Sequence, residues 1–398
     1  MRPMTDPTAL SSHLSARARS IRLGGGWARN EAISFIYGFP APECLPNEDI
    51  AAATARALRT HGEWALQYGG DPGLADVLIK KLARDQKIIC TRDNLMITAG
   101  SSQALAYICE LLLDPGDVVL SEAPTFLGTA RMMRNLGVEI EPVPLDDDGV
   151  RVDALEAALV RLRAAGKKPK LFYVIPTFQN PSGVTTTLER RKRIVALARE
   201  YDFAILEDDA YHDLRFAGDP LPPLYVLDGG ERTFYTGTFS KILAPGLRLG
   251  WMVAHPDLIA RIAALKTEGG ASPYSLHTAL EYCGADGANL DANIAKLRVI
   301  YKRRCETMLD ALAEFMPPGV RWTQPQGGFF IWLTLPGHID VTEMIASVRA
   351  RGVDYLPGNA CFFDGSGKNC IRLAFSYAPE DKLAEGIRVI AGEIRAQC

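Results

Sequence analysis

The chain has 398 residues, of which 47% are hydrophobic and 23% are charged, and its formal net charge is −3. This length corresponds to two or three domains, and the apolar share is large enough for a sizeable core, which excludes a disordered chain. Acids and bases nearly balance, so the charge gives no general attraction to nucleic acid or to anionic membranes, and no apolar run approaches the ~18 residues of a membrane span. We therefore expect a globular protein with neither nucleic-acid nor membrane partners.

The N-terminal segment is basic. Residues 7–30 contain four arginines and no acid, a composition that fits an organelle presequence or a surface arm, and we expect an arm over residues 1–32. The eight cysteines form no CxxC pair and no zinc-like cluster with histidine, so we expect reduced thiols, no metal site and a cytoplasmic protein.

Short apolar strands alternate with helical patterns through the middle of the chain. This alternation is typical of a mostly parallel sheet covered by helices on both faces, so we predict a three-layer α/β large domain over residues 55–290. The expected strands are 94–98, 117–122, 138–143, 171–176, 203–208, 232–238 and 249–254, and the expected helices are 101–113, 126–135, 153–163 and 188–201.

The pattern changes after residue 290. A long helical stretch at 292–315 is followed by shorter strands at 329–333 and 370–375, with another helix between them. We assign residues 291–398 to a smaller α+β domain, together with the Pro-rich segment 33–54, which belongs to this domain or to the edge of the cleft.

Ligands of open α/β sheets bind beyond the carboxyl ends of the strands, and polar motifs stand at those positions. In ITAGSSQAL, Gly100, Ser101 and Ser102 open a helix and can hold an anion, although simple helix capping is an alternative. In VIPTFQNPSG, Asn180 lies in a tight turn, which is an equally good explanation for it.

Two further motifs carry charge. In AILEDDAYHDL an apolar strand runs into Glu207, Asp208 and Asp209, which need a positive group nearby; we expect at least one of them to lie in a solvated turn. In TGTFSKILAPGLRLGW the only charges are Lys241 and Arg248 in apolar surroundings. The Pro-Gly pair breaks any helix between them, so both can point into one cleft, and a pair of surface cations is the weaker alternative.

Together these motifs predict one site with an anion cradle, a carboxylate, a turn amide, an arginine and a desolvated lysine. A phosphate suits the cradle and the arginine, a protonated ring nitrogen suits the carboxylate, and a carbonyl suits a lysine whose pKa is lowered. Pyridoxal phosphate carries all three groups, which makes it the predicted cofactor.

The combination of TFSKILAPGLRLG, QNPSG and EDDAY resembles fold-type I pyridoxal-phosphate aminotransferases of class I/II, in the subgroup of 2-aminoadipate and kynurenine aminotransferases. The resemblance runs from about Ile33 to the C-terminus. It implies that Lys241 forms the Schiff base, that Asp208 pairs with the pyridine nitrogen, and that Tyr211 and Asn180 hold the ring hydroxyl. Lys241, Asp208 and Tyr211 are thus the expected catalytic residues.

The same resemblance implies further contacts. The expected phosphate cradle is Gly100, Ser101 and Ser102 with Thr238, Ser240 and Arg248, and Phe126 stacks on the ring. Tyr68 resembles the tyrosine that reaches the phosphate of the neighbouring subunit, which implies a homodimer with the active site at the interface. Arg372 is expected to bind the substrate α-carboxylate beside Gly38, Tyr37 and Asn180. Without the resemblance, Phe126 and Tyr68 are ordinary core residues and Arg372 is equally a strand-end surface charge.

The predicted function is a ping-pong transfer of an amino group between an α-amino acid and a 2-oxo acid. Another pyridoxal-phosphate reaction on the same scaffold is the alternative: decarboxylation, elimination, or an oxidative or cyclising step. Regulators of this subgroup carry an N-terminal DNA-binding domain, whereas only 32 residues precede Ile33, so we expect an enzyme. The sequence leaves the amino donor and acceptor open.

Overall fold

The computed structural model describes residues 11–15, 18–19, 33–266 and 270–397. The predicted N-terminal arm over residues 1–32 falls mostly outside these ranges.

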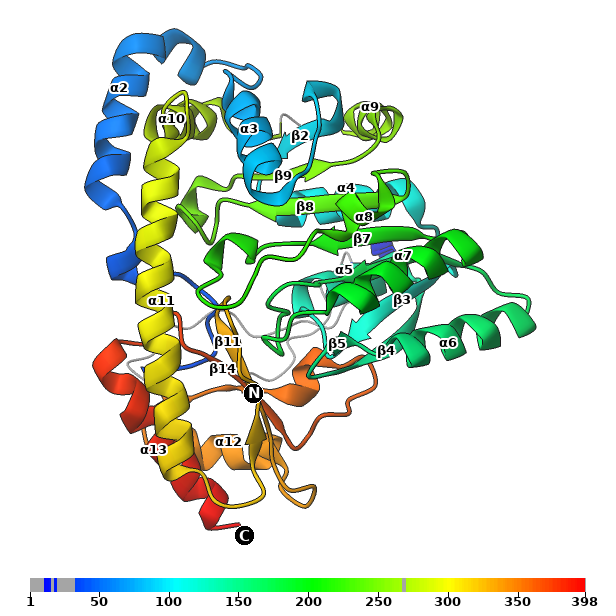
Figure 1. Cartoon of the computed structure of the whole chain (residues 1–398), viewed down its shortest axis with the longest axis vertical. Helices are drawn as coiled ribbons and strands as arrows, with labels where there is room; N and C mark the ends of the chain where they lie inside the picture. The colour runs from blue at the N-terminus through cyan, green and yellow to red at the C-terminus, as the bar shows by residue number, and fades with distance from the viewer. Residues whose placement is uncertain (1–10, 16–17, 20–32, 267–269, 398) are drawn as a thin grey trace.

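The largest sheet in the described residues has eight strands in the order β2-β9-β8-β7-β6-β3-β4-β5 (Figure 1). The pairs from β8 through β7, β6 and β3 to β4 are parallel, whereas β9 is antiparallel to both of its neighbours and β5 is antiparallel to β4. The bounds are β2 Leu95–Thr98, β3 Val118–Ala123, β4 Glu139–Asp146, β5 Gly149–Val150, β6 Pro169–Val174, β7 Ala204–Asp208, β8 Thr233–Thr238 and β9 Gly250–Val253.

Helices cover both faces of this sheet because its central strands are apolar on both sides. In β6, Leu171 and Tyr173 join one core while Phe172 and Val174 join the other, as the two-residue period of a strand requires. The first core includes residues of α4 (Ser101–Leu112), α5 (Leu127–Leu136) and α9 (Pro256–Leu265). The second includes residues of α6 (Val152–Ala164), α7 (Leu188–Tyr201) and α8 (Leu224–Asp228). The predicted three-layer, mostly parallel α/β architecture is confirmed.

A smaller antiparallel sheet has the order β10-β11-β14-β13, with bounds β10 Arg321–Trp322, β11 Phe330–Thr334, β13 Leu356–Pro357 and β14 Cys370–Ala374. It is accompanied by α12 (Val341–Ala350) and α13 (Leu383–Arg395). The Pro-rich segment begins in β1 (Ile33–Ser34), which pairs in parallel with β12 (Val353–Asp354). The division into a large and a small domain stays a prediction.

Three helices are gathered at the upper left of the molecule in Figure 1. α2 (Asn47–Ala65) lies along α10 (Pro273–Cys283), with α3 (Leu74–Gln86) beside them. The predicted domain boundaries fall inside α2 and inside α11 (Ala288–Phe315), a helix of 28 residues. Asn293 of α11 donates a hydrogen bond to the carbonyl of Ile242 at 2.8 Å, and Arg304 Nε donates to the carbonyl of Phe375 at 2.8 Å. α11 therefore joins the loop after β8 to the end of β14.

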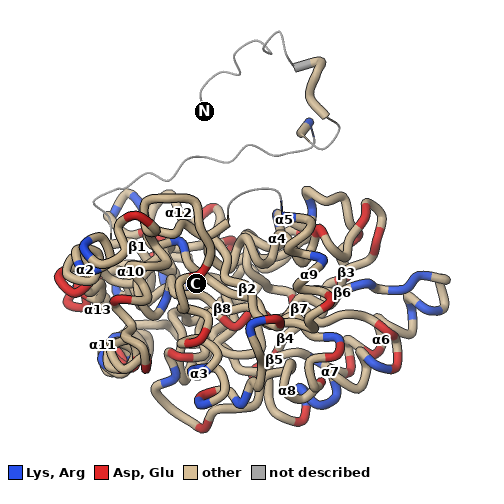
Figure 2. The backbone as a smooth tube through the Cα atoms, turned by 90° about the horizontal axis from the view of Figure 1, so that it is seen from above, with Lys and Arg blue, Asp and Glu red and all other residues tan. Residues whose placement is uncertain are grey.

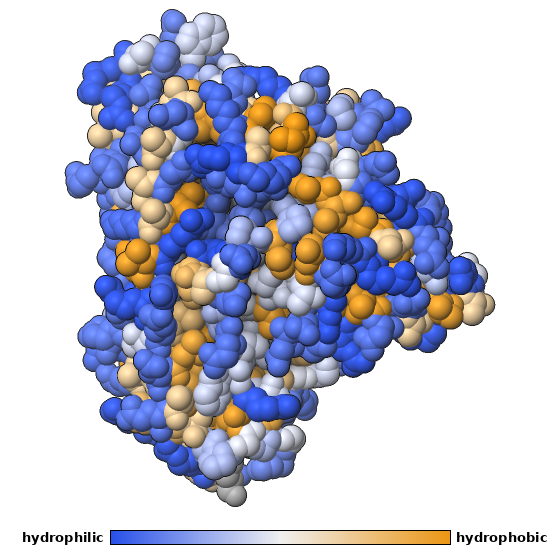
Figure 3. Space-filling model, viewed as in Figure 1, coloured by the Kyte–Doolittle hydropathy of each residue, from blue (hydrophilic) through white to orange (hydrophobic). Residues whose placement is uncertain are grey.

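The charged residues of both signs are interspersed over the outer helices and loops (Figure 2), and hydrophilic atoms predominate on the face drawn in Figure 3. None of the helices in the described ranges is long and apolar enough to cross a membrane.

Candidate functional site

A cavity of 610 Å³ lies between the large sheet and the smaller one. Its lining comes from the ends of β3, β6, β7 and β8, from the start of α4, and from the segment after β1 with β11 and β14. This is the edge where ligands of open α/β sheets bind. The predicted site residues in the lining are Tyr37, Gly38, Ser101, Ser102, Phe126, Asn180, Asp208, Tyr211, Thr238, Ser240, Lys241, Arg248 and Arg372.

Lys241 enters the cavity from the loop after β8. Its Nζ donates a hydrogen bond to the carbonyl of Gly38 at 2.9 Å. Burial, with a further contribution from the positive charge of Arg372, lowers the pKa of Lys241 to about 8. A lysine with this pKa is about 10% neutral at pH 7, far more than an ordinary lysine, and the neutral amine is the nucleophile and the base.

The start of α4 and Arg248 form a cradle for an anion. Gly100 has φ +81°, and a Cβ atom there would lie 2.5 Å from Nη2 of Arg248, so only glycine allows the guanidinium to approach. Arg248 itself has a left-handed φ of 53°, a strained conformation that is concentrated at functional sites. Ser101 and Ser102 supply the first N–H groups of the helix, which favour a phosphate.

Hydroxyl groups extend this cradle on the β8 side. Thr238 Oγ1 lies 2.9 Å from Ser240 Oγ and accepts the backbone N–H of Ser240 at 3.0 Å. Gly100 is absent from the cavity lining itself, but it lies between the helix start and Arg248.

The three acids at the end of β7 are all buried: Glu207 is 0% exposed, and Asp208 and Asp209 are each 5% exposed. The expectation that one of them lies in a solvated turn is therefore wrong. The carboxylate of Glu207 accepts hydrogen bonds from the backbone N–H groups of Leu224 and Tyr225, both at 2.9 Å. These donors take the place of the water molecules that would bind an exposed carboxylate.

Asp208 is the member of the three that faces the cavity. Desolvation raises the pKa of its carboxyl group to about 6. Oδ2 accepts a hydrogen bond from the hydroxyl of Tyr173 at 2.9 Å, and that hydroxyl accepts one from Thr129 at 3.1 Å. Within the described part of the chain, Oδ1 has only a long 3.5 Å contact with Thr236. A cation placed against Oδ1 would favour the ionised form.

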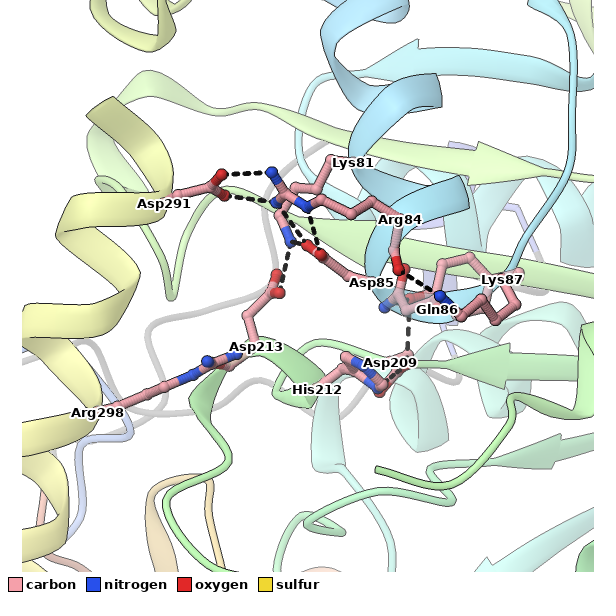
Figure 4. A network of polar contacts seen from close by, with 11 residues as sticks. Lys81, Arg84, Asp85, Gln86, Lys87, Asp209, His212, Asp213, Asp291 and Arg298 are labelled. Atoms are coloured by element: carbon pink, nitrogen blue, oxygen red, sulfur yellow. Dashed lines mark hydrogen bonds and ion pairs between the residues drawn. The ribbon is translucent and has the colours of Figure 1, made fainter. Parts of the chain in front are cut away.

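Asp209 holds the same segment in place through two further contacts. It accepts a hydrogen bond from Tyr235 at 3.0 Å and lies 3.4 Å from Nδ1 of His212. Asp213 lies two residues after Tyr211, which lines the cavity, and the buried Lys81 bridges Asp213 at 2.5 Å and Asp85 at 2.9 Å (Figure 4). These contacts hold the segment that follows Asp208.

Arg372, on β14, lines the same cavity. Its Nη1 donates to Oδ1 of Asn180 at 3.0 Å, its Nη2 donates to the carbonyl of Ile36, and its guanidinium lies 4.4 Å from the ring centre of Phe330. Nε is buried without a hydrogen-bond partner among the described residues. Burial lowers the pKa of Arg372, so a carboxylate that neutralises it would be favoured.

The wall next to Arg372 is aromatic. The rings of Tyr37 and Phe39 stack with centres 5.2 Å apart, and Tyr377 meets both of them edge-on. Gly38 leaves room for this wall, because a Cβ atom there would lie 2.4 Å from the ring of Phe330. The predictions from sequence included Tyr37 and Gly38 and missed the other aromatic residues.

Tyr68 lies outside the cavity. It follows α2 and is 94% exposed. Within this chain it therefore contacts none of the predicted site residues, and its predicted role depends on a second subunit.

The residues of the cavity fit pyridoxal phosphate. The cradle of Gly100 and Arg248 suits its phosphate, the open Oδ1 of Asp208 suits a protonated ring nitrogen, and the desolvated amine of Lys241 suits its aldehyde. Among the residues with described positions, no group of three or more His, Cys, Asp or Glu side chains could hold a metal ion.

Comparisons with known proteins agree with this geometry. Residues 42–390 match the model of the family "Aminotransferase class I and II". The chain is 42% identical to the aromatic-amino-acid aminotransferase 1 of Thermococcus litoralis over 92% of this chain and 89% of that protein. The structure is similar to that of a Pyrococcus horikoshii kynurenine aminotransferase in complex with PMP, with a TM-score of 0.92, 40% identity and 98% coverage of both chains.

A third relative is the α-aminoadipate aminotransferase of Thermus thermophilus, solved with N-(5'-phosphopyridoxyl)-L-leucine. It has a TM-score of 0.81 and 34% identity, with 92% of each chain covered. The family match and the named relatives support transamination over the other pyridoxal-phosphate reactions. The chain belongs to the class I and II aminotransferases and is a transaminase that uses pyridoxal phosphate.

Proposed function

We propose that the 610 Å³ cavity is the transaminase active site and that the residues gathered there have the roles predicted from the sequence. One observation carries this proposal: a desolvated lysine, a buried carboxylate and a buried arginine with an unsatisfied N–H face a single cavity. Lys241, Asp208 and Tyr211 are the catalytic residues in this assignment.

Pyridoxal phosphate, when bound, supplies an aldehyde that exchanges amines and a ring that accepts the electron pair left on Cα of the amino acid. Arg248, Ser101, Ser102, Thr238 and Ser240 would hold its phosphate, with the N–H groups at Gly100 and the helix start. Phe126 would lie against the ring, and Asn180 and Tyr211 would bind its hydroxyl group.

Lys241 is the base in this proposal. With the cofactor bound, the Nζ of Lys241 would be placed to take the proton from Cα of the substrate and to return a proton. Asp208 keeps the ring nitrogen protonated by accepting its N–H, and Tyr173 and Thr129 hold that carboxylate in place. Arg372 binds the α-carboxylate and thereby fixes the Cα–H bond toward Lys241.

The aromatic wall favours a donor with a large apolar side chain. Tyr37, Phe39 and Phe330 line the cavity on the side of Arg372, where the side chain of an amino acid bound through its carboxylate lies. Aromatic rings bury large areas against such a wall. The name of the Thermococcus litoralis relative supports the same class, so we infer that aromatic amino acids are donors.

We further propose a cytoplasmic homodimer with the active site at the subunit interface. Trp64, Leu66 and Tyr68 are 60%, 73% and 94% exposed around the end of α2, which is unusual for large apolar side chains that remain in water. The seven described cysteines are unpaired, in keeping with a reducing compartment.

A panel of amino acids tests the substrate assignment. Each is added to the purified enzyme loaded with pyridoxal phosphate, the cofactor absorption band is followed, and the 2-oxo acid is identified by mass spectrometry. We expect phenylalanine and tyrosine to give the corresponding oxo acids and an aminated cofactor. Release of CO₂ or of an elimination product without an aminated cofactor would contradict the proposal.

A further inference from the structure

Glu122, at the end of β3, is a buried acid that the proposed mechanism does not use. Its side chain is 0% exposed. Oε2 accepts a hydrogen bond from the backbone N–H of Ile175 at 3.0 Å and another from Nε2 of Gln179 at 3.1 Å. Ile175 directly follows β6, which is the parallel neighbour of β3. Glu122 therefore joins the carboxyl ends of two adjacent strands, at the edge of the sheet where the cavity lies.

Gln179 completes this contact from the turn that follows β6. Its Nε2 also donates to the carbonyl of Pro124 at 2.8 Å. Its Oε1 accepts the backbone N–H of Ser182 at 2.8 Å and the hydroxyl of the same residue at 2.7 Å. Gln179 is 1% exposed, and a buried amide whose donors and acceptor are all in use is held in one orientation. We call this pair of side chains the Glu122–Gln179 clamp.

The clamp connects two segments that each carry a residue of the cavity. Phe126 lies two residues after Pro124, and Asn180 directly follows Gln179. Both Phe126 and Asn180 line the cavity. In the proposed site Phe126 lies against the ring of pyridoxal phosphate and Asn180 binds its hydroxyl group. The clamp thus links a residue that would contact the face of the ring to one that would contact its edge.

We propose that Glu122 and Gln179 are positioning residues of the transaminase: their hydrogen bonds hold the segment of Phe126 at a fixed offset from the turn of Asn180, and thereby seat the ring of pyridoxal phosphate. The proposal rests on the roles given to Phe126 and Asn180 in the proposed function. Neither Glu122 nor Gln179 lines the cavity, so both act through their neighbours. A displacement of about 1 Å in a bound reactant is enough to slow a reaction strongly.

The clamp depends on hydrogen bonds and not on a charge. Burial raises the pKa of Glu122 to about 8, so its carboxyl group is mostly protonated at neutral pH. Oε2 accepts both hydrogen bonds, whereas Oε1 has no hydrogen-bond partner among the described residues. A glutamine can place its carbonyl oxygen where Oε2 lies and keep both contacts. A methionine of similar length has no such acceptor and leaves the N–H groups of Ile175 and Gln179 unpaired in the interior.

Four variants test the clamp. Glu122→Met and Gln179→Met break it, Glu122→Gln keeps its hydrogen bonds, and Asp228→Leu is the control. Asp228 is 1% exposed and also accepts two hydrogen bonds, from the backbone N–H of Arg232 at 2.6 Å and from the hydroxyl of Thr233 at 3.0 Å. Thr233 begins β8, so this acid lies at the end of the sheet away from the cavity.

Three measurements are made on each protein. Thermal unfolding of the apoprotein reports folding. The absorption spectrum of the enzyme loaded with pyridoxal phosphate is recorded across the pH range in which its visible band changes. Finally, kcat and KM are measured with phenylalanine. The spectrum is taken without any amino acid, so it reports the surroundings of the ring independently of the substrate assignment.

A hydrogen bond donated to the ring oxygen makes that oxygen less basic, so a displaced Asn180 raises the pH midpoint of the band. We expect a rise of about 0.5–1 unit in Glu122→Met and Gln179→Met, which is roughly a 3- to 10-fold change in the ionisation constant. In both variants kcat falls by about 10- to 100-fold. KM changes by less than about threefold, because Arg372 keeps its contact with the carbonyl of Ile36.

Glu122→Gln is expected to stay within about twofold of wild type in kcat and to keep the midpoint of the band, because both hydrogen bonds remain. Asp228→Leu is expected to unfold at a lower temperature without any shift of the band. A folded Glu122→Met with the band and kcat of wild type would overturn the positioning role. So would a Glu122→Gln variant that loses as much as Glu122→Met, since the carboxyl group itself would then matter.

A band shift of equal size in Asp228→Leu would also overturn the role, because general loosening of the fold would then explain it. If Glu122→Met does not fold, Gln179→Met decides between the same outcomes, since the N–H of Ile175 keeps its acceptor there. A wild-type protein that binds no pyridoxal phosphate would instead count against the proposed function.

Discussion

The hydroxyl of Tyr173 donates a hydrogen bond to Oδ2 of Asp208 over 2.9 Å, between the neighbouring parallel strands β6 and β7. Both residues are buried, and the hydroxyl is itself oriented by Thr129. A buried carboxylate is costly unless donors surround it. This contact therefore lets Asp208 remain an acceptor for a positively charged ring nitrogen at neutral pH.

Tyr173→Phe removes the donor and leaves Oδ2 unpaired, so the pKa of Asp208 rises further above its ordinary value. We expect the dissociation constant of pyridoxal phosphate to rise by roughly tenfold at pH 7, and by less at pH 9, where the carboxyl group is ionised in either protein. Fluorescence titration at both pH values measures this. Thr129→Val, which keeps the Tyr173 hydroxyl, is the milder control; equal effects at both pH values would argue against the electrostatic role.

Asp208→Asn separates stability from function. The pKa of Asp208 in the folded apoprotein, about 6, lies above the ordinary value of 3.8. Ionising the buried carboxyl group therefore lowers the free energy of unfolding. This loss is absent below about pH 4, grows up to about pH 6 and is fully present above it. The variant apoprotein is therefore expected to be more stable than wild type at pH 7.5 by on the order of 1–3 kcal/mol, with the difference vanishing near pH 4. Urea unfolding of apoproteins across this range measures it.

The same variant is expected to lose transaminase activity by at least about 100-fold, because an amide cannot hold the proton on the ring nitrogen as a carboxylate does. An apoprotein that is less stable at pH 7.5 would contradict the raised pKa of Asp208, and an enzyme that keeps its rate would show that Asp208 is not the partner of the ring nitrogen.

Lys241→Ala is expected to abolish turnover, by about 10⁴-fold or more, since the base and the covalent anchor are lost together. Borohydride reduction followed by peptide mass spectrometry is expected to mark Lys241 in the wild type and no residue in the variant. Because the neutral amine is the nucleophile, attachment of the cofactor to wild-type apoenzyme accelerates as pH rises through about 8. Lys192→Ala on exposed α7 serves as the control, and labelling at another lysine would contradict the assignment.

Arg372→Lys and Arg372→Met test the α-carboxylate contact. We expect kcat/KM to fall by about 100-fold in Arg372→Met for every amino acid, with only partial recovery in Arg372→Lys because lysine lacks the planar fork. The affinity for pyridoxal phosphate is measured in parallel and is expected to change little. A loss confined to diacids would contradict the assignment of Arg372 to the α-carboxylate.

Tyr68→Ala tests the subunit interface. If Tyr68 reaches the phosphate of the neighbouring subunit, the variant remains a dimer in analytical ultracentrifugation and binds pyridoxal phosphate several-fold more weakly. Leu58→Ala, at a less exposed apolar position of α2, is the comparison. A wild-type protein that sediments as a monomer of 43.5 kDa with full activity would contradict the dimeric site.

The sheet and the motif residues could be predicted because their signals are local. Short apolar runs such as LFYVIP, bounded by turn residues, are typical of buried strands. Lys241 could be identified because a charged ammonium group in an apolar segment is costly to bury. The buried state of Glu207 and Asp209 could not be predicted in the same way, because the backbone N–H groups and the tyrosine hydroxyl that satisfy them come from later parts of the chain.

The sequence also could not predict residues whose role depends on where the fold places their side chains. Tyr173 has the pattern of an ordinary core strand residue, and only the parallel register with β7 brings its hydroxyl to Asp208. Tyr377 lies more than 300 residues from Tyr37, and no periodic pattern joins positions so far apart.

The helix α11 ties the two ends of the substrate space to one support. Asn293 holds the carbonyl beside Lys241, and Arg304 holds the carbonyl that follows the strand of Arg372, about 17 Å apart along the same helix. A regular helix neither stretches nor shortens at ordinary cost. We infer that this helix backbone helps to keep the loop of Lys241 and the end of the strand of Arg372 at a constant separation.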